Sequence, residues 1–207
     1  MQKEDIPRFL ASLSPEHGYT TVAACGDVRI SIDGEMHKGT IEVHWHNNGC
    51  FNADFYGPFG VIAGSIKGTE SGGTVTLAEG QYKFAFTQTM DSLPFAWGKD
   101  LTFGDMVMVL LGRMPSAYAA RMQLSPDSYS YDRKTISGLW KTDTLDIHAI
   151  IRNRAERQSR VMFVFKKHLP FWYLTFQSFK QGRAFKIEFR ENDRNYFSIK
   201  YTKVKCN

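Results

Sequence analysis

The chain has 207 residues, a formal net charge of +5 and a hydrophobic content of 43%, of which the aromatic residues form a large part at 14%. This length permits one large β domain or two small ones, with a core that needs no disulfide. The three cysteines are far apart and form no C-x-x-C pair, which argues against a zinc ribbon or a redox motif.

The N-terminal residues predict a short amphipathic helix over residues 5–13, with Asp5 as its cap and Pro7 in its first turn. The chain start carries no apolar signal region and no bilayer-spanning run follows. We therefore read the start either as a cytoplasmic one or as that of an exported protein whose export segment has been removed. The apolar positions of the helix fall at i, i+3, i+4 and i+7: Ile6, Phe9, Leu10 and Leu13.

Residues 20–87 predict a meander of strands, because apolar and polar residues alternate with period two. Val28 and Ile30, for example, alternate with Arg29 and Ser31. Asp33-Gly34 is a hairpin turn signal, and Asn47-Asn48-Gly49 is another. The later strands of this meander are expected at 50–56, 61–67, 73–79 and 81–87.

Residues 101–115 interrupt the strands and predict a helix. Thr102 can cap it together with Asp105, while Gly112 and Pro115 are stop signals. The residues between are apolar on every side, which predicts a helix buried all round. Two readings stay open: an ordinary core helix, or a lid that lies on a sheet and closes an apolar cavity.

Strands resume over residues 125–203, and each again has one apolar face. They are expected near 128–139, 143–152, 158–166, 171–179, 184–191 and 195–203. A single antiparallel sheet of about eleven strands should curl into a barrel or half-barrel. We therefore predict a mainly β protein, a half-open antiparallel β-barrel with a helical lid over a hydrophobic cavity. Residues 1–207 form one domain in this prediction.

No catalytic motif and no nucleotide fingerprint occurs, so we predict a binding protein without a cofactor rather than an enzyme. Glu42, His44 and His46 share a strand face that could chelate zinc, but no further His or Cys completes four ligands, so no metal is expected. The basic run 152–160 is read as a solvated hairpin tip or as a contact with phosphate.

The apolar residues on the inward faces of the strands and on the helix must either pack together as a core or line a cavity. We predict that they line a lipid-binding pocket beneath the helix, and a fully packed core is the alternative that pattern alone leaves open. The predicted lining residues are Ile41, Val43, Phe55, Tyr82, Phe84, Phe86, Phe103, Met106, Val109, Leu110, Phe185 and Ile187.

Three short pieces follow one another along residues 20–115: Phe55-Tyr56-Gly57-Pro58-Phe59-Gly60, Leu77-Ala78-Glu79-Gly80-Gln81-Tyr82 and Leu110-Leu111-Gly112-Arg113-Met114-Pro115. In their order and spacing they resemble the LolA/LolB family of bacterial lipoprotein carriers and outer-membrane receptors, more closely the LolB side. The later strands match this family in number and character rather than in motif.

The resemblance implies a half-open barrel whose cavity receives the acyl chains of lipoproteins or a related lipid without covalent chemistry. It implies a periplasmic location or the inner leaflet of the outer membrane, a membrane surface and a periplasmic carrier protein as partners, and we expect a monomer. Phe59 occupies what resembles the membrane-facing loop of the receptors; a core position is the alternative for this residue. The other functional hypotheses are a basic barrel for single-stranded nucleic acid and, third, an enzyme acting on a hydrophobic substrate.

Overall fold

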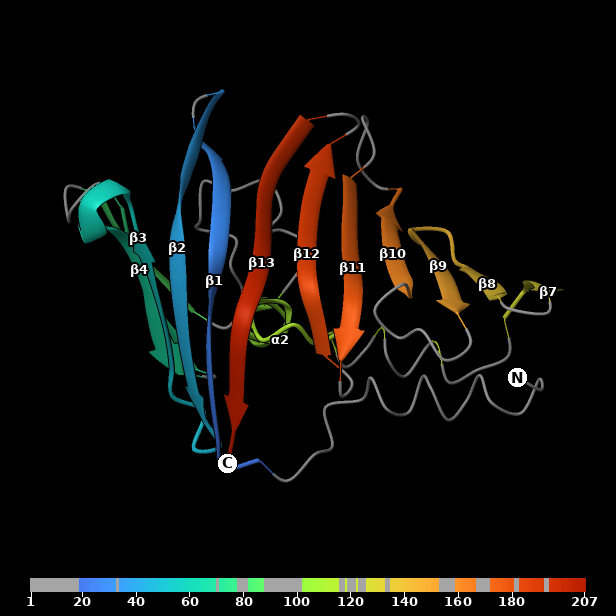
Figure 1. Cartoon of the computed structure of the whole chain (residues 1–207), viewed down its shortest axis with the longest axis horizontal. Helices are drawn as coiled ribbons and strands as arrows, with labels where there is room; N and C mark the ends of the chain where they lie inside the picture. The colour runs from blue at the N-terminus through green and yellow to red at the C-terminus, as the bar shows by residue number, and fades with distance from the viewer. Residues whose placement is uncertain are drawn as a thin grey trace.

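The computed structural model describes most of the chain as one antiparallel sheet of 13 strands (Figure 1). The mainly β prediction is therefore confirmed, and the sheet is open rather than closed, as in a half-barrel. The described residues are 19–32, 34–69, 71–77, 82–87, 102–115, 118, 122, 126–132, 135–152, 159–166, 172–180, 183–191 and 194–207.

In the first half of the chain, β1 and β2 are the longest strands, and the strands that follow toward the edge of the sheet are shorter. The bounds are β1 Thr21–Ile32, β2 Glu35–His46, β3 Phe51–Tyr56, β4 Ile62–Thr69, β5 Gly72–Leu77 and β6 Tyr82–Thr87. A one-turn 3-10 helix, η1 Pro58–Gly60, joins β3 to β4, and the helix α2 Phe103–Leu110 follows β6. The second half comprises β7 Ser128–Asp132, β8 Thr135–Lys141, β9 Leu145–Arg152, β10 Arg160–Phe165, β11 Trp172–Lys180, β12 Arg183–Glu191 and β13 Arg194–Cys206.

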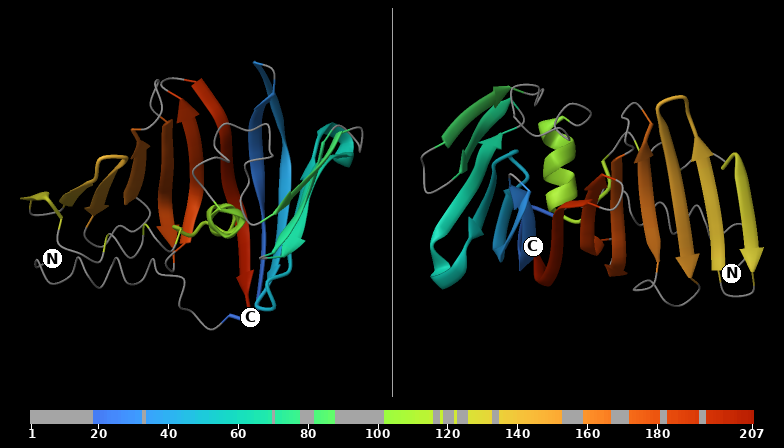
Figure 2. Two further views of the ribbon diagram at one scale, coloured as in Figure 1. Left: turned by 180° about the vertical axis from the view of Figure 1, so that it is seen from behind. Right: turned by 90° about the horizontal axis from the view of Figure 1, so that it is seen from above.

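The strand order places the first and last strands side by side at the centre of the sheet. The order is β6-β5-β4-β3-β2-β1-β13-β12-β11-β10-β9-β8-β7, so both edges belong to the middle of the sequence. The segment from β6 to β7 must therefore cross one face of the sheet, and α2 lies on that inner face (Figure 2). Seen from above, α2 sits inside the curve of the sheet, while β7 to β10 extend beyond it to one side.

Local signals set the ends of several elements, as the sequence predicts. Gly49 has a φ of 84° in the turn after β2, and Gly34 has a φ of 86° before it, values that favour glycine. Gly39 is required for a different reason, because a Cβ there would lie 2.0 Å from the Tyr56 carbonyl oxygen of the neighbouring strand. Asp33, the other half of the predicted turn, lies outside the described residues, as do the predicted helix at 5–13 and residues 153–158 of the basic run.

The helix α2 begins and ends at the residues that the sequence indicates. The Thr102 hydroxyl accepts from the Asp105 amide at 3.1 Å, and the Asp105 carboxylate accepts from the Thr102 amide at 3.0 Å. Gly112 ends the helix with a φ of 73°, and a Cβ there would lie 2.4 Å from the Ala184 carbonyl oxygen. The helix is not buried all round, however, because Gly104 is exposed and Met108 is half-buried.

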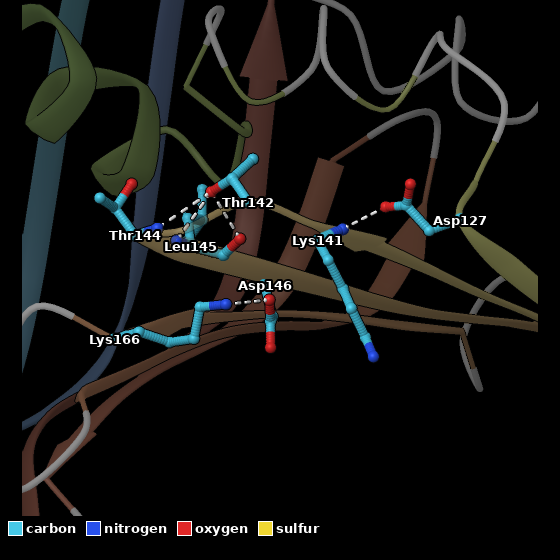
Figure 3. A network of polar contacts seen from close by, with 7 residues as sticks. All are labelled: Asp127, Lys141, Thr142, Thr144, Leu145, Asp146 and Lys166. Atoms are coloured by element: carbon cyan, nitrogen blue, oxygen red, sulfur yellow. Dashed lines mark hydrogen bonds and ion pairs between the residues drawn. The ribbon is translucent and has the colours of Figure 1, made fainter.

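The expected single strand over 128–139 is two strands, which accounts for much of the excess over the predicted eleven. β7 and β8 pair with each other around residues 133–134, where neither glycine nor proline marks a turn. In the turn from β8 to β9, Leu145 N–H donates to the Thr142 hydroxyl at 2.9 Å (Figure 3). The Asp127 carboxylate accepts from the Lys141 amide and joins the start of β7 to the end of β8. An ion pair of 2.9 Å between Lys166 and Asp146 ties β9 to the end of β10.

Candidate functional site

The inner face of the sheet beneath α2 is the candidate site, because it gathers most of the predicted lining residues. Ile41, Val43 and Ile187 are buried on the strands, and Met106 is buried on the helix above them. They form one contiguous hydrophobic core with Phe55, Phe86, Phe103, Val109 and Leu110. In this structure the helix lies directly on the strand residues.

Phe103 anchors the first turn of α2 to the first half of the sheet. Its ring centroid lies 4.7 Å from that of Phe86 on the edge strand β6 and 6.0 Å from that of Phe51 on β3. Gly68 on β4 lies under the same ring, because a Cβ there would lie 3.0 Å from the Phe103 ring. One aromatic side chain therefore holds the helix against three strands.

Three of the predicted lining residues are less enclosed than the others. Phe84 and Phe185 are partly buried and pack against the edge of the core. Tyr82 lies on the same face of β6 as Phe84 and Phe86, but 58% of its surface is exposed. These residues therefore lie at the border of the site rather than beneath the helix.

The C-terminal end of α2 is attached to the second half of the sheet by polar contacts. The Arg183 guanidinium donates to the Leu111 carbonyl oxygen at 3.1 Å, and the Tyr201 hydroxyl donates to the Leu110 carbonyl oxygen. The Ala184 amide donates to the Gly112 carbonyl oxygen at 2.7 Å. These donors satisfy carbonyl groups that the end of a helix leaves without partners.

Arg113 and Arg183 form a buried cationic cluster at this end of the helix. Their exposed fractions are 6% and 4%, and the two guanidinium carbons lie 5.5 and 5.2 Å from the centre of the Tyr19 ring. Burial lowers the pKa of Arg113 to about 10, and the charge of Arg183 adds to the effect. Burial likewise lowers the pKa of Arg183, although Cys206 and Tyr19 act against it. Burial raises the pKa of Tyr201 well above its usual range.

Sequence reasoning missed this cluster. Arg183, Tyr201 and Tyr19 come from three distant parts of the chain, and only the sheet order brings them together. A local signal existed for Arg113 alone, because a cation directly after a helix stop is placed to interact with the helix C-terminus.

Phe59 lies at the tip of the loop between β3 and β4, and its side chain is fully exposed. The reading that buries Phe59 in the core is therefore wrong. Its φ of 66° belongs to the left-handed region, which costs a non-glycine residue about 1–2 kcal/mol. Gly60 shares this backbone conformation, with a φ of 76°, whereas Gly57 is extended. Val61 and Ile62 are also exposed and enlarge the apolar tip.

The other candidate sites are unremarkable in the part of the chain that the structure describes. Glu42, His44 and His46 lie exposed along the outer face of β2, and the described residues contain no group of three potential ligands for a metal. Cys25, Cys50 and Cys206 are free thiols, so no disulfide joins Cys25 to Cys50. Within the same residues, no helix has the length and apolar character needed to cross a membrane.

No family model matches the chain, and no curated protein matches it in sequence. Solved structures do match its fold. A domain from Vibrio parahaemolyticus described as an outer membrane lipoprotein-sorting protein aligns with a TM-score of 0.53 and 11% identity, over 98% of this chain and 91% of that chain. A LolA superfamily protein from Nitrosomonas europaea aligns with a TM-score of 0.48 and 9% identity, over 100% and 94% of the two chains. The chain therefore shares the fold of the Vibrio domain, and in this chain that fold is an open antiparallel sheet with a helix on its inner face.

Proposed function

We propose that the protein binds the acyl chains of lipoproteins, or of a related lipid, between α2 and the inner face of the sheet. The observation that carries the proposal is a short apolar helix laid on an equally apolar sheet surface within an open sheet. The fold supports the same class of function, because the Vibrio domain of similar fold is described as a lipoprotein-sorting protein.

In this proposal α2, as it lies on the inner face, closes the site. Acyl chains would take the place of α2 on residues such as Ile41, Val43 and Ile187, so that one apolar contact replaces another with little change in buried area. Opening would break few hydrogen bonds at the helix C-terminus, chiefly those from Arg183, Tyr201 and Ala184. A helix attached in this way is suited to moving as a lid.

The exposed loop supports a membrane-facing role for Phe59. A fully exposed phenylalanine in a strained conformation, beside exposed Val61 and Ile62, is typical of a surface that a membrane or partner will cover. We place the protein in the periplasm or at the inner leaflet of the outer membrane, working as a carrier or receptor with a periplasmic carrier protein as a partner. Binding requires no cofactor and no covalent step.

The lipid-binding proposal is tested by thermal unfolding with a synthetic diacylated or triacylated lipopeptide. A ligand at about 100 times its dissociation constant stabilises the folded protein by about 2.7 kcal/mol. The unacylated peptide is the control and should leave the melting temperature unchanged. Equal melting temperatures with and without the acylated peptide would contradict the proposal.

The membrane role of Phe59 is tested by the Phe59→Glu variant. Since the side chain is fully exposed, we expect the melting temperature to change little, and transfer of lipopeptide to liposomes to fall several-fold. Lys203→Glu is the control for added negative charge, because Lys203 is exposed on β13 and lies apart from the β3–β4 loop. If both variants reduce transfer equally, or if Phe59→Glu unfolds the protein, the loop does not have this role.

A further inference from the structure

The outer face of β7 to β10, opposite the face that we assign to acyl chains, carries a pocket of about 510 Å³. Its volume lies within the range of about 300–1,000 Å³ that is usual for small-molecule sites. These strands extend to one side beyond α2 (Figure 2). Along β9 and β10 the side chains that line the pocket alternate with those of Ala149 and Val161, which are buried on the inner face, so the pocket lies on the opposite face.

Strand pairing arranges the pocket side chains in two rows across four strands. Residues paired across neighbouring antiparallel strands point to the same face, and the pairs that line the pocket continue from β7 to β10. The first row is Ser130, Ser137, Ile150 and Arg160, and the second is Ser128, Leu139, His148 and Met162.

Three apolar side chains, those of Leu139, Ile150 and Met162, line part of this pocket beside the polar Ser128 and His148. Leu139 and Met162 flank His148 in the second row, and Ile150 in the first row is 39% exposed. The polar rim includes the hydroxyl groups of Ser130 and Ser137, which lie 2.6 Å apart in a mutual hydrogen bond.

Arg160 brings a cation with unused hydrogen-bond donors into this pocket. Among the residues that the structure describes, its buried Nε has no hydrogen-bond partner, and its Nη2 contacts the Met162 sulfur, a weak acceptor, at 3.7 Å. Nε and Nη2 lie on the same edge of the guanidinium and form the two-donor fork that binds a carboxylate or phosphate. No carboxylate of the described residues forms an ion pair with Arg160.

Arg190 is an example of an arginine with a structural role on the same face, and it can be compared with Arg160. It also lies on the outer face, on β12, and its Nε, like that of Arg160, is buried without a partner among the described residues. The difference is that its Nη2 contacts the Glu188 carboxylate at 2.7 Å. An arginine whose Nη2 instead contacts a thioether, beside apolar side chains, is arranged for an anion that comes from outside the chain.

We propose that this pocket binds a small amphiphilic anion, with a carboxylate or phosphate head on the Arg160 fork and an apolar body over Leu139, Ile150 and Met162. This site would also give a function to one residue of the basic run 152–160, of which only Ser159 and Arg160 have described side chains. The inference is independent of the proposed acyl-chain site.

The test uses methyl NMR of the protein labelled at its methionines, with octanoate, octyl phosphate and octanol as probes. Met162 reports on this pocket and Met106 on the inner face, and the substitutions Met162→Leu and Met106→Leu assign the two signals. We expect octanoate or octyl phosphate to shift the Met162 signal in a saturable way, with octanol binding more weakly by about tenfold or more. The stronger of the two anions identifies the head group.

Arg160→Met keeps an apolar stem but removes the fork, so the affinity for the anions should fall about tenfold to a hundredfold while that for octanol is unchanged. Arg160→Lys keeps the charge without the fork and should also bind the anions more weakly than the parent. Lys200→Gln removes an exposed cation outside the pocket and is the control for net charge. The proposal is overturned if anions shift only Met106, if octanol binds at Met162 as tightly as octanoate, or if Lys200→Gln weakens binding as much as Arg160→Met.

Discussion

On the inner face of the sheet, side chains such as Ile41, Phe163 and Ile187 are fully buried, and α2 adds a second apolar layer. On the outer face of the same strands, Glu188 on β12 gathers Lys186 at 2.9 Å, Arg190 at 2.7 Å and Gln177 at 2.9 Å. Burial of apolar area therefore stabilises one face, while partly exposed charge pairs stabilise the other. Because apolar burial contributes far more per side chain than a partly solvated ion pair, the two faces should differ strongly in their response to substitution.

This contrast also explains why the pocket at β7 to β10 is distinctive. There the outer face combines apolar side chains with the cation of Arg160. The arginine on β12 is paired with a carboxylate, whereas the arginine on β10 lies beside apolar side chains and forms no ion pair with a described carboxylate. We propose that ligand binding is the reason for this difference.

The largest effect should follow the removal of the aromatic anchor of α2. Phe103→Ala deletes a buried ring between Phe51 and Phe86 and should lower the free energy of unfolding by about 3–5 kcal/mol. Urea denaturation followed by tryptophan fluorescence measures this change. A loss below about 1 kcal/mol would show that the helix is not an integral part of the inner core.

On the outer face, Glu188→Gln should lower the free energy of unfolding by a smaller amount, about 1–2 kcal/mol. Lys186 and Arg190 lose a common carboxylate but remain partly solvated. Burial acts to raise the pKa of Glu188, but hydrogen bonds from Lys186 and Arg190 outweigh it and leave the pKa lowered. The stabilisation is therefore fully present above the ordinary pKa of a glutamate, about 4.3, and is lost as the pH falls through the lowered value.

Urea denaturation of the parent and Glu188→Gln at neutral pH and at about pH 3 tests this assignment. The difference in stability between the two proteins should shrink at the acidic pH. Lys67→Met is the control, since its ion pair with Asp54 is long, at 3.9 Å, and the Lys67 side chain is 60% exposed. A difference that is the same at both pH values would contradict the charged role of Glu188.

The smallest effect on stability should come from Tyr201→Phe, which removes one hydroxyl without changing the packing. The Leu110 carbonyl oxygen loses its donor, at a cost of about 1 kcal/mol. Hydrogen exchange should report faster opening of α2, while amides of β1 and β13 at the centre of the sheet exchange as in the parent. Unchanged exchange in α2 would show that this contact does not hold the helix.

The sequence by itself determined the features that depend on neighbouring residues. Thr102 and Asp105 start α2, Gly112 ends it and Gly49 turns the chain, because capping and left-handed dihedrals are properties of a few consecutive residues. Period-two alternation likewise assigned most strands and their inner faces, so that residues such as Val43 and Ile187 are where the pattern predicts. The role of these residues in binding a ligand stays a prediction.

Only the tertiary structure decided the features that depend on which strands are neighbours. Residues 133–134, between β7 and β8, include no glycine or proline, so the sequence pattern predicts one strand over 128–139 where the pairing of the strands shows two. Arg113 and Arg183 are 70 positions apart in the sequence and meet only because β12 lies under the end of α2. Arg160 faces an apolar pocket because three other strands supply its walls. Such contacts follow from the strand order, which local patterns do not encode, since pairing partners are selected by the folding of the whole sheet.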